Sequence, residues 1–212
     1  MLFGDKYKFA IEYNFIEHPY GDERGILHDS WGGVRLWIDG VDLFQYKVIF
    51  RGKEMSRNYE WNLCMIVEWL CENLHTIVTI SEFPNNIQAM TAFDYLEQNE
   101  LLRPEFETED FLNWHKGAHE WLATHWVFYG ADGSNLPNLF LRRIDDKIEF
   151  SWNNEGFLKD REIFFCSKSG YKLIDMNVFY KVVKEFLNDF IRRFKNKYPV
   201  EMKTLQDKII LN

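Results

Sequence analysis

The chain has 212 residues, the size of one large domain, and 17% of them are aromatic. A formal net charge of −8 disfavours direct binding to DNA or RNA, because the phosphate backbone repels an acidic surface. No apolar run approaches the ~20 residues of a membrane span, and the amino terminus lacks a signal-peptide apolar stretch. We therefore expect a cytoplasmic, single-domain protein with one aromatic-rich core and no cofactor.

The first third of the chain predicts β-strands. Apolar and polar residues alternate over Tyr7–Phe15, the period-2 pattern of a half-buried strand. Gly, Pro and mixed charges over His18–Gly33 predict a loop. Two apolar runs, Val34–Ile38 and Val41–Phe50, then flank an Asp-Gly dipeptide, which favours the type I′ turn of a two-residue hairpin.

The middle of the chain predicts helices. Apolar residues recur at helical spacing over Arg57–Ile77, and a weaker pattern covers Ile87–Gln98. An acidic connection, Glu97–Asp110, follows and leads into a third helix that begins at Thr108. Acidic residues in the first turn of that helix are favourable, because the amino-terminal end of a helix dipole is positive.

A second hairpin is predicted over Asn138–Arg143 and Lys147–Trp152. If Asp145-Asp146 forms the turn, Arg142 lies opposite Glu149 as a cross-strand ion pair. One face then carries Leu139, Leu141, Ile148, Phe150 and Trp152 and is expected to face the core. The other face carries Phe140, Arg142, Glu149 and Ser151 and is expected to point outward.

The last part of the chain predicts two strands, Arg161–Ser167 and Tyr171–Ile174, and an amphipathic helix capped by Asp175 and ended by Pro199. Together these elements predict an α+β fold in which antiparallel β-hairpins pack against three or four helices. The three cysteines, Cys64, Cys71 and Cys166, show no framework spacing, so we expect buried free thiols.

Catalytic motifs are not evident in the sequence. His115 and His119 are spaced i, i+4 on a predicted helix and can share a face, and Glu120 follows directly. The zinc motif H-E-x-x-H would need a histidine at position 123, where Ala123 stands. A metal-dependent hydrolase using His115, His119 and Glu120 is one hypothesis, and two histidines on a polar helix face are the alternative.

Clustered carboxylates allow a second enzymatic hypothesis. Asp145, Asp146 and Glu149 lie near one another in the sequence and could indicate a metal-dependent nuclease. A hairpin turn with an Arg142–Glu149 ion pair explains the same residues from strand geometry, and we favour it.

Two segments together resemble a known bacterial family. One runs Glu68-Trp-Leu-Cys-Glu-Asn-Leu-His-Thr-Ile and is followed by Glu82-Phe-Pro; the other contains Trp114, His115, His119 and Trp121, then Leu136-Pro-Asn-Leu-Phe-Leu-Arg-Arg-Ile-Asp-Asp-Lys-Ile-Glu-Phe-Ser-Trp152. They are similar to the amino-terminal region that precedes the peptidase domain in some ImmA/IrrE-type metallopeptidase proteins. The likeness covers about half of the chain, and no H-E-x-x-H motif follows it. The resemblance implies an accessory domain that senses a signal or binds a partner in a stress or defence setting.

The sequence therefore leads to two non-enzymatic hypotheses. In the first, the protein binds another protein in a bacterial defence or toxin–immunity-like system, through the outer hairpin face together with His115 and His119. In the second, it is an acidic inhibitor that mimics nucleic acid, acting through Glu105, Glu107 and Glu109.

Overall fold

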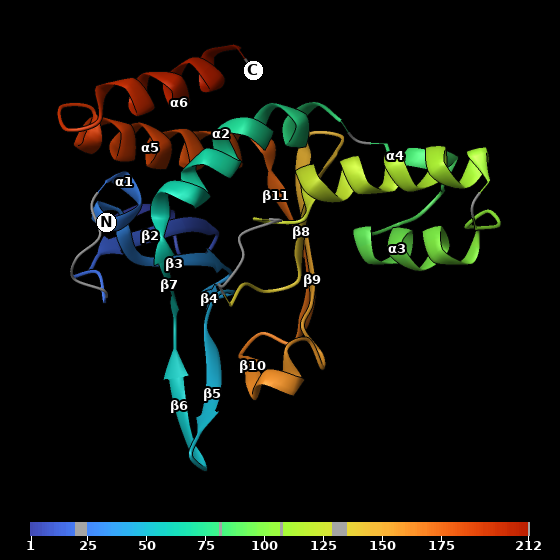
Figure 1. Ribbon diagram of the computed structural model, residues 1–212, viewed down its shortest axis with the longest axis horizontal. Helices are drawn as coiled ribbons and strands as arrows, with labels where there is room; N and C mark the ends of the chain where they lie inside the picture. The colour runs from blue at the N-terminus through green and yellow to red at the C-terminus, as the bar shows by residue number, and fades with distance from the viewer. Residues whose placement is uncertain (20–24, 81, 107, 129–134, 212) are drawn as a thin grey trace.

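The computed structural model describes residues 1–19, 25–80, 82–106, 108–128 and 135–211, and it has the expected α+β fold (Figure 1). The described strands form three antiparallel sheets. In the first sheet the order is β1-β2-β3-β4, and β7 pairs with β3 as well. Its strands are β1 (Leu2–Asp5), β2 (Phe9–Phe15), β3 (Trp31–Ile38), β4 (Val41–Asp42) and β7 (Tyr59–Asn62).

The other two sheets have three strands each. The second has the order β10-β5-β6 and projects from the body as a ribbon, and the third has the order β11-β9-β8 (Figure 1). Their strands are β5 (Tyr46–Phe50), β6 (Lys53–Arg57), β8 (Leu139–Ile144), β9 (Lys147–Asn153), β10 (Ile163–Phe165) and β11 (Ser169–Asp175).

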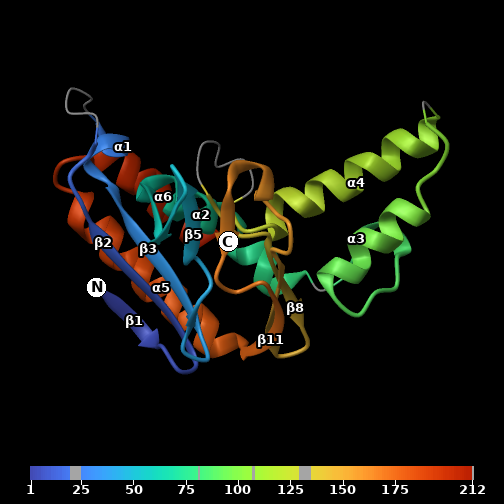
Figure 2. The same cartoon turned by 90° about the horizontal axis from the view of Figure 1, so that it is seen from below.

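Two long helices cover the first and third sheets. The helix α5 packs on β1 and β2, whereas α2 packs on β3 and β8, so the main core lies between helices and sheets (Figure 2). The helices are α1 (Ile26–Asp29), α2 (Leu63–Thr79), α3 (Ala92–Leu101), α4 (Glu109–His125), α5 (Met176–Phe194) and α6 (Pro199–Leu211), with 3₁₀ turns η1 (Pro84–Asn86) and η2 (Lys159–Arg161).

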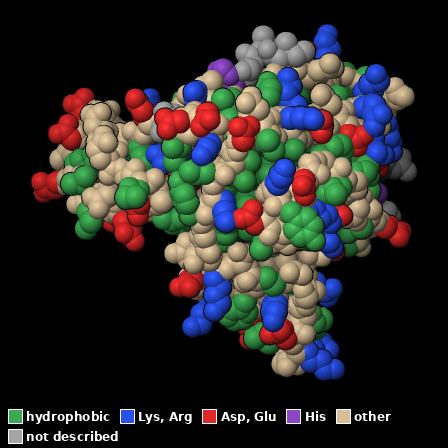
Figure 3. Space-filling model, turned by 180° about the vertical axis from the view of Figure 1, so that it is seen from behind, with side chains coloured by type: hydrophobic (Ala, Val, Ile, Leu, Met, Phe, Trp, Pro, Cys, Tyr) green, Lys and Arg blue, Asp and Glu red, His purple; other side chains and the backbone are tan. Residues whose placement is uncertain are grey.

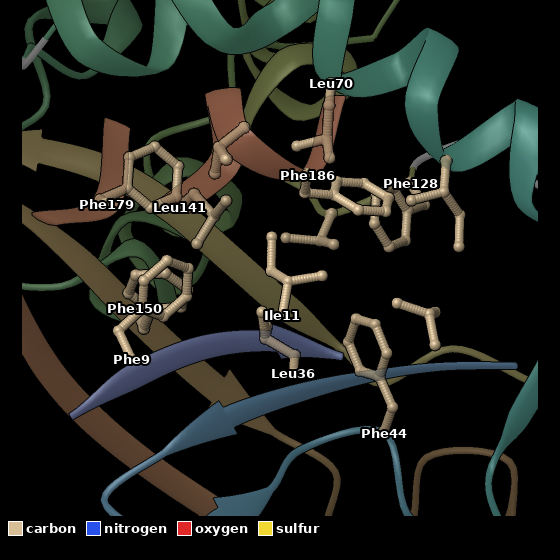
Figure 4. A pocket seen from close by; sticks show the side chains of 14 residues that line it. Phe9, Ile11, Leu36, Phe44, Leu70, Phe128, Leu141, Phe150, Phe179 and Phe186 are labelled. Atoms are coloured by element: carbon tan, nitrogen blue, oxygen red, sulfur yellow. The ribbon is translucent and has the colours of Figure 1, made fainter. Parts of the chain in front are cut away.

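The main core is dominated by aromatic rings. Phe9, Phe150 and Phe179 pack together with ring centroids 5.3 to 5.8 Å apart. Beside them lies an entirely apolar cavity of about 30 Å³. Its walls include side chains from the first and third sheets and from α2 and α5 (Figure 4). That volume is close to one methylene group, so the cavity is a packing defect rather than a ligand site.

The first hairpin has the predicted turn but a much shorter second strand. Asp39 and Gly40 both have positive φ, as a type I′ turn requires, and Ile38 pairs with Val41. The chain leaves β3 after Asp42, and Tyr46–Phe50 joins the second sheet instead. The apolar run Val41–Phe50 is therefore divided between two sheets.

The predicted loop over His18–Gly33 is confirmed at His18 and Pro19 but is wrong for most of its second described part, 25–33. Residues 26–29 form α1, and β3 begins at Trp31. Gly32 lies inside β3, where a Cβ atom would come within 2.2 Å of the Asn14 carbonyl oxygen. The glycine that suggested a loop instead allows the β2 and β3 backbones to approach closely.

Helix boundaries differ from the predictions for local reasons. The α2 helix starts at Leu63 rather than Arg57, because Tyr59–Asn62 pairs with β3 as strand β7. Thr108 caps α4 and Asp175 caps α5, as expected, through side-chain oxygens that accept backbone N–H groups. Pro199 begins α6, since proline is tolerated in the first turn of a helix.

Cysteine placement follows the prediction for two of three residues. Cys64 and Cys71 are buried in α2, and burial raises the pKa of each thiol to about 12. Cys166 is a free thiol too, but it is exposed. No helix in the described ranges combines the length and the hydropathy needed to cross a bilayer.

Candidate binding site on a projecting helical arm

The segment 82–126, which contains η1, α3 and α4, projects from the body and is called the arm below (Figures 1 and 2). Its sequence holds nine acidic and two basic residues, a formal charge of −7. The whole chain has 33 acidic and 25 basic residues, so 24 acidic and 23 basic residues remain outside the arm, a charge of −1. Nearly all of the net charge of the protein is thus concentrated on one projection.

The acidic side chains of the arm are exposed. Figure 3 shows carboxylates on several sides of the projection, at the left of that view. Glu105 and Glu109, which the sequence placed on an acidic surface, are both exposed, whereas Glu107 lies outside the described residues. The exposed acids are Glu82, Asp94, Glu97, Glu100, Glu105, Glu109, Asp110 and Glu120.

Large apolar side chains surround the turn between α3 and α4, and these form the arm tip. Leu101, Leu102, Phe106 and Leu112 are 76%, 57%, 70% and 64% exposed. Single exposed apolar residues are ordinary on protein surfaces, but these four all lie between positions 101 and 112, on either side of one turn. The arm tip is therefore apolar and lies among carboxylates.

His115 and His119 lie on the exposed surface of α4. Their ring centroids are 6.3 Å apart, and the His115 ring is 5.9 Å from that of Phe111. In the parts of the chain that the structure describes, no three potential metal ligands come together. The i, i+4 spacing brings the two histidines to one face, as expected, without adding a third ligand.

The arm is attached to the body by a buried ion pair. Arg142 on β8 and Glu149 on β9 lie opposite each other, as predicted, and Nη2 of the arginine is 2.8 Å from a carboxylate oxygen. The second carboxylate oxygen accepts the backbone N–H of Ala92 at 3.0 Å, and Arg142 donates to the Met90 carbonyl at 2.9 Å. Arg142 also lies 4.0 Å from the centroid of the Phe83 ring.

The expected exposure of this hairpin face is therefore wrong. Phe140, Arg142, Glu149 and Ser151 are 1%, 7%, 0% and 2% exposed. The arm covers them: Phe140 belongs to a second hydrophobic cluster with Ile87, Ala92, Tyr95 and Trp121. Alternation showed that these four residues share a face, but the presence of a covering segment could not be derived from β8 and β9 alone.

A pocket of about 310 Å³, called the root pocket, lies where α4 meets the end of α2. Its walls include Phe83, Trp121 and His125, and its lining contains two carboxylates, Glu82 and Glu120. The His125 ring stacks on Trp121 with centroids 4.6 Å apart and planes 7° apart. Burial lowers the pKa of His125 to about 4, so the ring is neutral at pH 7.

Sequence reasoning did not select His125 as a site residue. The i, i+4 spacing of His115 and His119 directed attention to those two histidines instead. The available signal was the i, i+4 spacing of His125 from Trp121, which places both rings on the same helix face.

The fold and the arm define an α+β protein with a concentrated acidic projection and a small pocket at its base. The chain belongs to the family of unknown function DUF5984, whose model matches residues 31–207. Comparison with curated protein sequences gave no match. A solved structure, CdiI from Burkholderia dolosa AUO158, is 18% identical with a TM-score of 0.45, covering 89% of this chain and 99% of that chain. These values establish neither a shared fold nor a shared function.

Proposed function

We propose that this protein is a non-enzymatic binding protein that docks its acidic arm onto a basic, apolar-lined surface of another protein. One observation carries the proposal: the arm holds −7 of the net charge of −8 and also has an exposed apolar tip. Opposite charge would steer the partner to the arm, and the apolar side chains would supply area to bury.

A protein partner accounts for both features of the arm better than the alternatives do. An acidic surface repels the phosphates of nucleic acid, and it attracts a groove that itself binds phosphates. Exposed leucines and Phe106 contribute most when they enter pockets that exclude water, as interface anchors do. The proposal therefore extends to inhibition: the arm would occupy a nucleic-acid or other anion-binding groove of a toxin-like or defence-associated enzyme.

The proposal changes the binding surface that was expected from the sequence and keeps the expected biological setting. The binding surface moves from the covered hairpin face to the arm, which also carries His115 and His119. The setting of bacterial defence or toxin immunity, implied by the resemblance to accessory regions of ImmA/IrrE-type proteins, is retained as part of the proposal.

Affinity purification with matched variants tests this function. The arm variant Glu97→Lys/Glu100→Lys/Glu105→Lys reverses three exposed acids near the end of α3, where lysine suits the helix dipole. We expect the wild-type protein to retain a stoichiometric partner at low salt, less of it at moderate salt, and the arm variant to retain none.

The control variant is Glu155→Lys/Asp160→Lys/Asp207→Lys, which makes the same charge change at exposed positions outside the arm. We expect it to retain the partner. Equal retention by both triple variants, or no retained protein at either salt concentration, would contradict the proposed function.

A further inference from the structure

One residue that lines the root pocket, His125, has a buried polar atom that the fold leaves unused. His125 is 1% exposed and lines this pocket, and its Nε2 has no hydrogen-bond partner among the described residues. A buried polar atom without a partner is destabilising, so the position suits a ligand that supplies the missing hydrogen bond.

The neighbouring contacts fix the chemistry of that atom. His125 Nδ1 lies 2.9 Å from the Trp121 carbonyl oxygen, which can only accept, and 2.7 Å from Thr124 Oγ1. The Thr124 hydroxyl donates its proton to the carbonyl oxygens of Glu120 and Trp121, so it accepts from Nδ1, and the ring proton is assigned to Nδ1. The neutral ring then has a lone pair on Nε2. The group that completes the site must therefore be a hydrogen-bond donor.

Charge at the pocket adds a second requirement. Glu82 and Glu120 belong to its lining, and no lysine or arginine does. Lys116 is 3.8 Å from Glu120, but both side chains are more than 60% exposed, so this pair is weak. Arg142 lies against Phe83 and is already paired with Glu149. A positively charged ligand is the one that these carboxylates favour.

We propose that the root pocket binds the alkyl guanidinium or alkyl ammonium group of a ligand, whose N–H donates to His125 Nε2 while Glu82 and Glu120 balance its charge. The apolar stem of such a ligand would lie against Phe83, Pro84 and Trp121. The cationic group can come from two sources. One is a basic side chain of the protein partner, and for that source the inference rests on the proposed function. The other is a free organic amine.

The first experiment uses the full chain and a defined probe. N-acetyl-arginine amide is titrated while the indole N–H resonance of Trp121, assigned with a Trp121→Phe variant, is followed by NMR. We expect a saturable shift with a Kd on the order of 1 mM, the affinity that a ligand of this size reaches. The neutral isostere N-acetyl-citrulline amide should produce no saturable shift.

Matched variants assign the contacts. His125→Phe keeps a ring beside Trp121 but removes the acceptor, and it should abolish saturation; His115→Phe, on the exposed face, should leave the Kd unchanged. Glu82→Gln/Glu120→Gln should weaken binding about tenfold, as expected for two exposed ion pairs. Equal binding of the citrulline probe, or unchanged binding by His125→Phe, would overturn the assignment.

Partner capture then separates the two sources. If His125→Phe loses the partner that wild type retains, the cation belongs to the partner; if capture persists while arginine binding is lost, the pocket serves a free amine. The arm variant used above leaves Glu82, Glu120 and His125 intact, so it should bind the arginine probe normally even when capture fails.

Discussion

Arg142 and Glu149 lie opposite each other on β8 and β9, and besides their own ion pair their side chains hydrogen-bond the backbone of Met90 and Ala92, where the chain enters α3. This pair of side chains therefore helps to hold the arm against the third sheet, beside the apolar contacts of Phe140 with the arm. With the carboxylate fully buried, removing either partner leaves an uncompensated charge under the arm.

Breaking this pair is expected to be costly. Glu149→Ala should lower the free energy of unfolding by about 3–5 kcal/mol, because Arg142 loses its counter-ion in a buried site. Urea denaturation measures the change. The double variant Arg142→Met/Glu149→Leu should be more stable than Glu149→Ala, since it leaves no buried charge; a double variant less stable than the single one would show that the ion pair is not the main contribution.

Protonation of His125 should destabilise the fold in acid. The pKa of its ring is lowered from 6.5 to about 4 by burial, so the unfolded state binds a proton first as the pH falls. This contribution to stability is fully present above pH 6.5 and is lost progressively as the pH falls to about 4. The loss should reach about 3 kcal/mol.

The comparison with His125→Phe isolates that contribution, because other groups titrate in the same range. The difference in unfolding free energy between wild type and His125→Phe should change with pH between about 6.5 and 4 and be flat above it. His115→Phe, which changes an exposed ring, serves as the control. A difference that does not vary with pH would mean that His125 is as easily protonated in the fold as in the unfolded chain.

The apolar cavity in the main core should accept one additional methylene group. Val34, Val127 and Val183 line it, and each is replaced singly by isoleucine. A replacement that fills the cavity should raise the free energy of unfolding by up to about 0.8 kcal/mol. Thermal or urea unfolding gives the result. Losses of stability in all three variants would indicate that the walls cannot adjust to the larger side chain.

Polar substitutions at the arm tip should separate binding from folding. Leu101→Ser/Phe106→Ser removes two side chains that are 76% and 70% exposed, so stability should change by less than about 0.5 kcal/mol for each. Partner capture should fall sharply, because these groups are the proposed anchors. Unfolding curves and affinity purification are measured on the same preparation. Undiminished capture would exclude the arm tip from the interface.

Much of the local structure could be predicted from the sequence, whereas the covering of one element by another could not. The register that places Arg142 opposite Glu149 follows from the turn and from strand alternation. The caps Thr108 and Asp175 follow from side-chain chemistry.

The errors concern long-range contacts. Strand β7 forms because β3 is available to pair with it, and the outer face of β8 and β9 is buried because α3 and α4 return over it. The same contrast between local features and long-range contacts applies to the prediction of the site. The exposed acids of the arm could be found from composition, but His125 became a candidate only when its burial and its unused nitrogen were known.

The second hydrophobic cluster gives the base of the arm a small core of its own, which meets the body at Phe140. Its rings pack on one another and on Phe140, while the main core has its own set of side chains. Changes of length, charge or sequence at the far end of α3 and α4 should therefore have little effect on the packing of the main core. A family built on this plan could exchange one projection for another and acquire a new target while keeping the same scaffold.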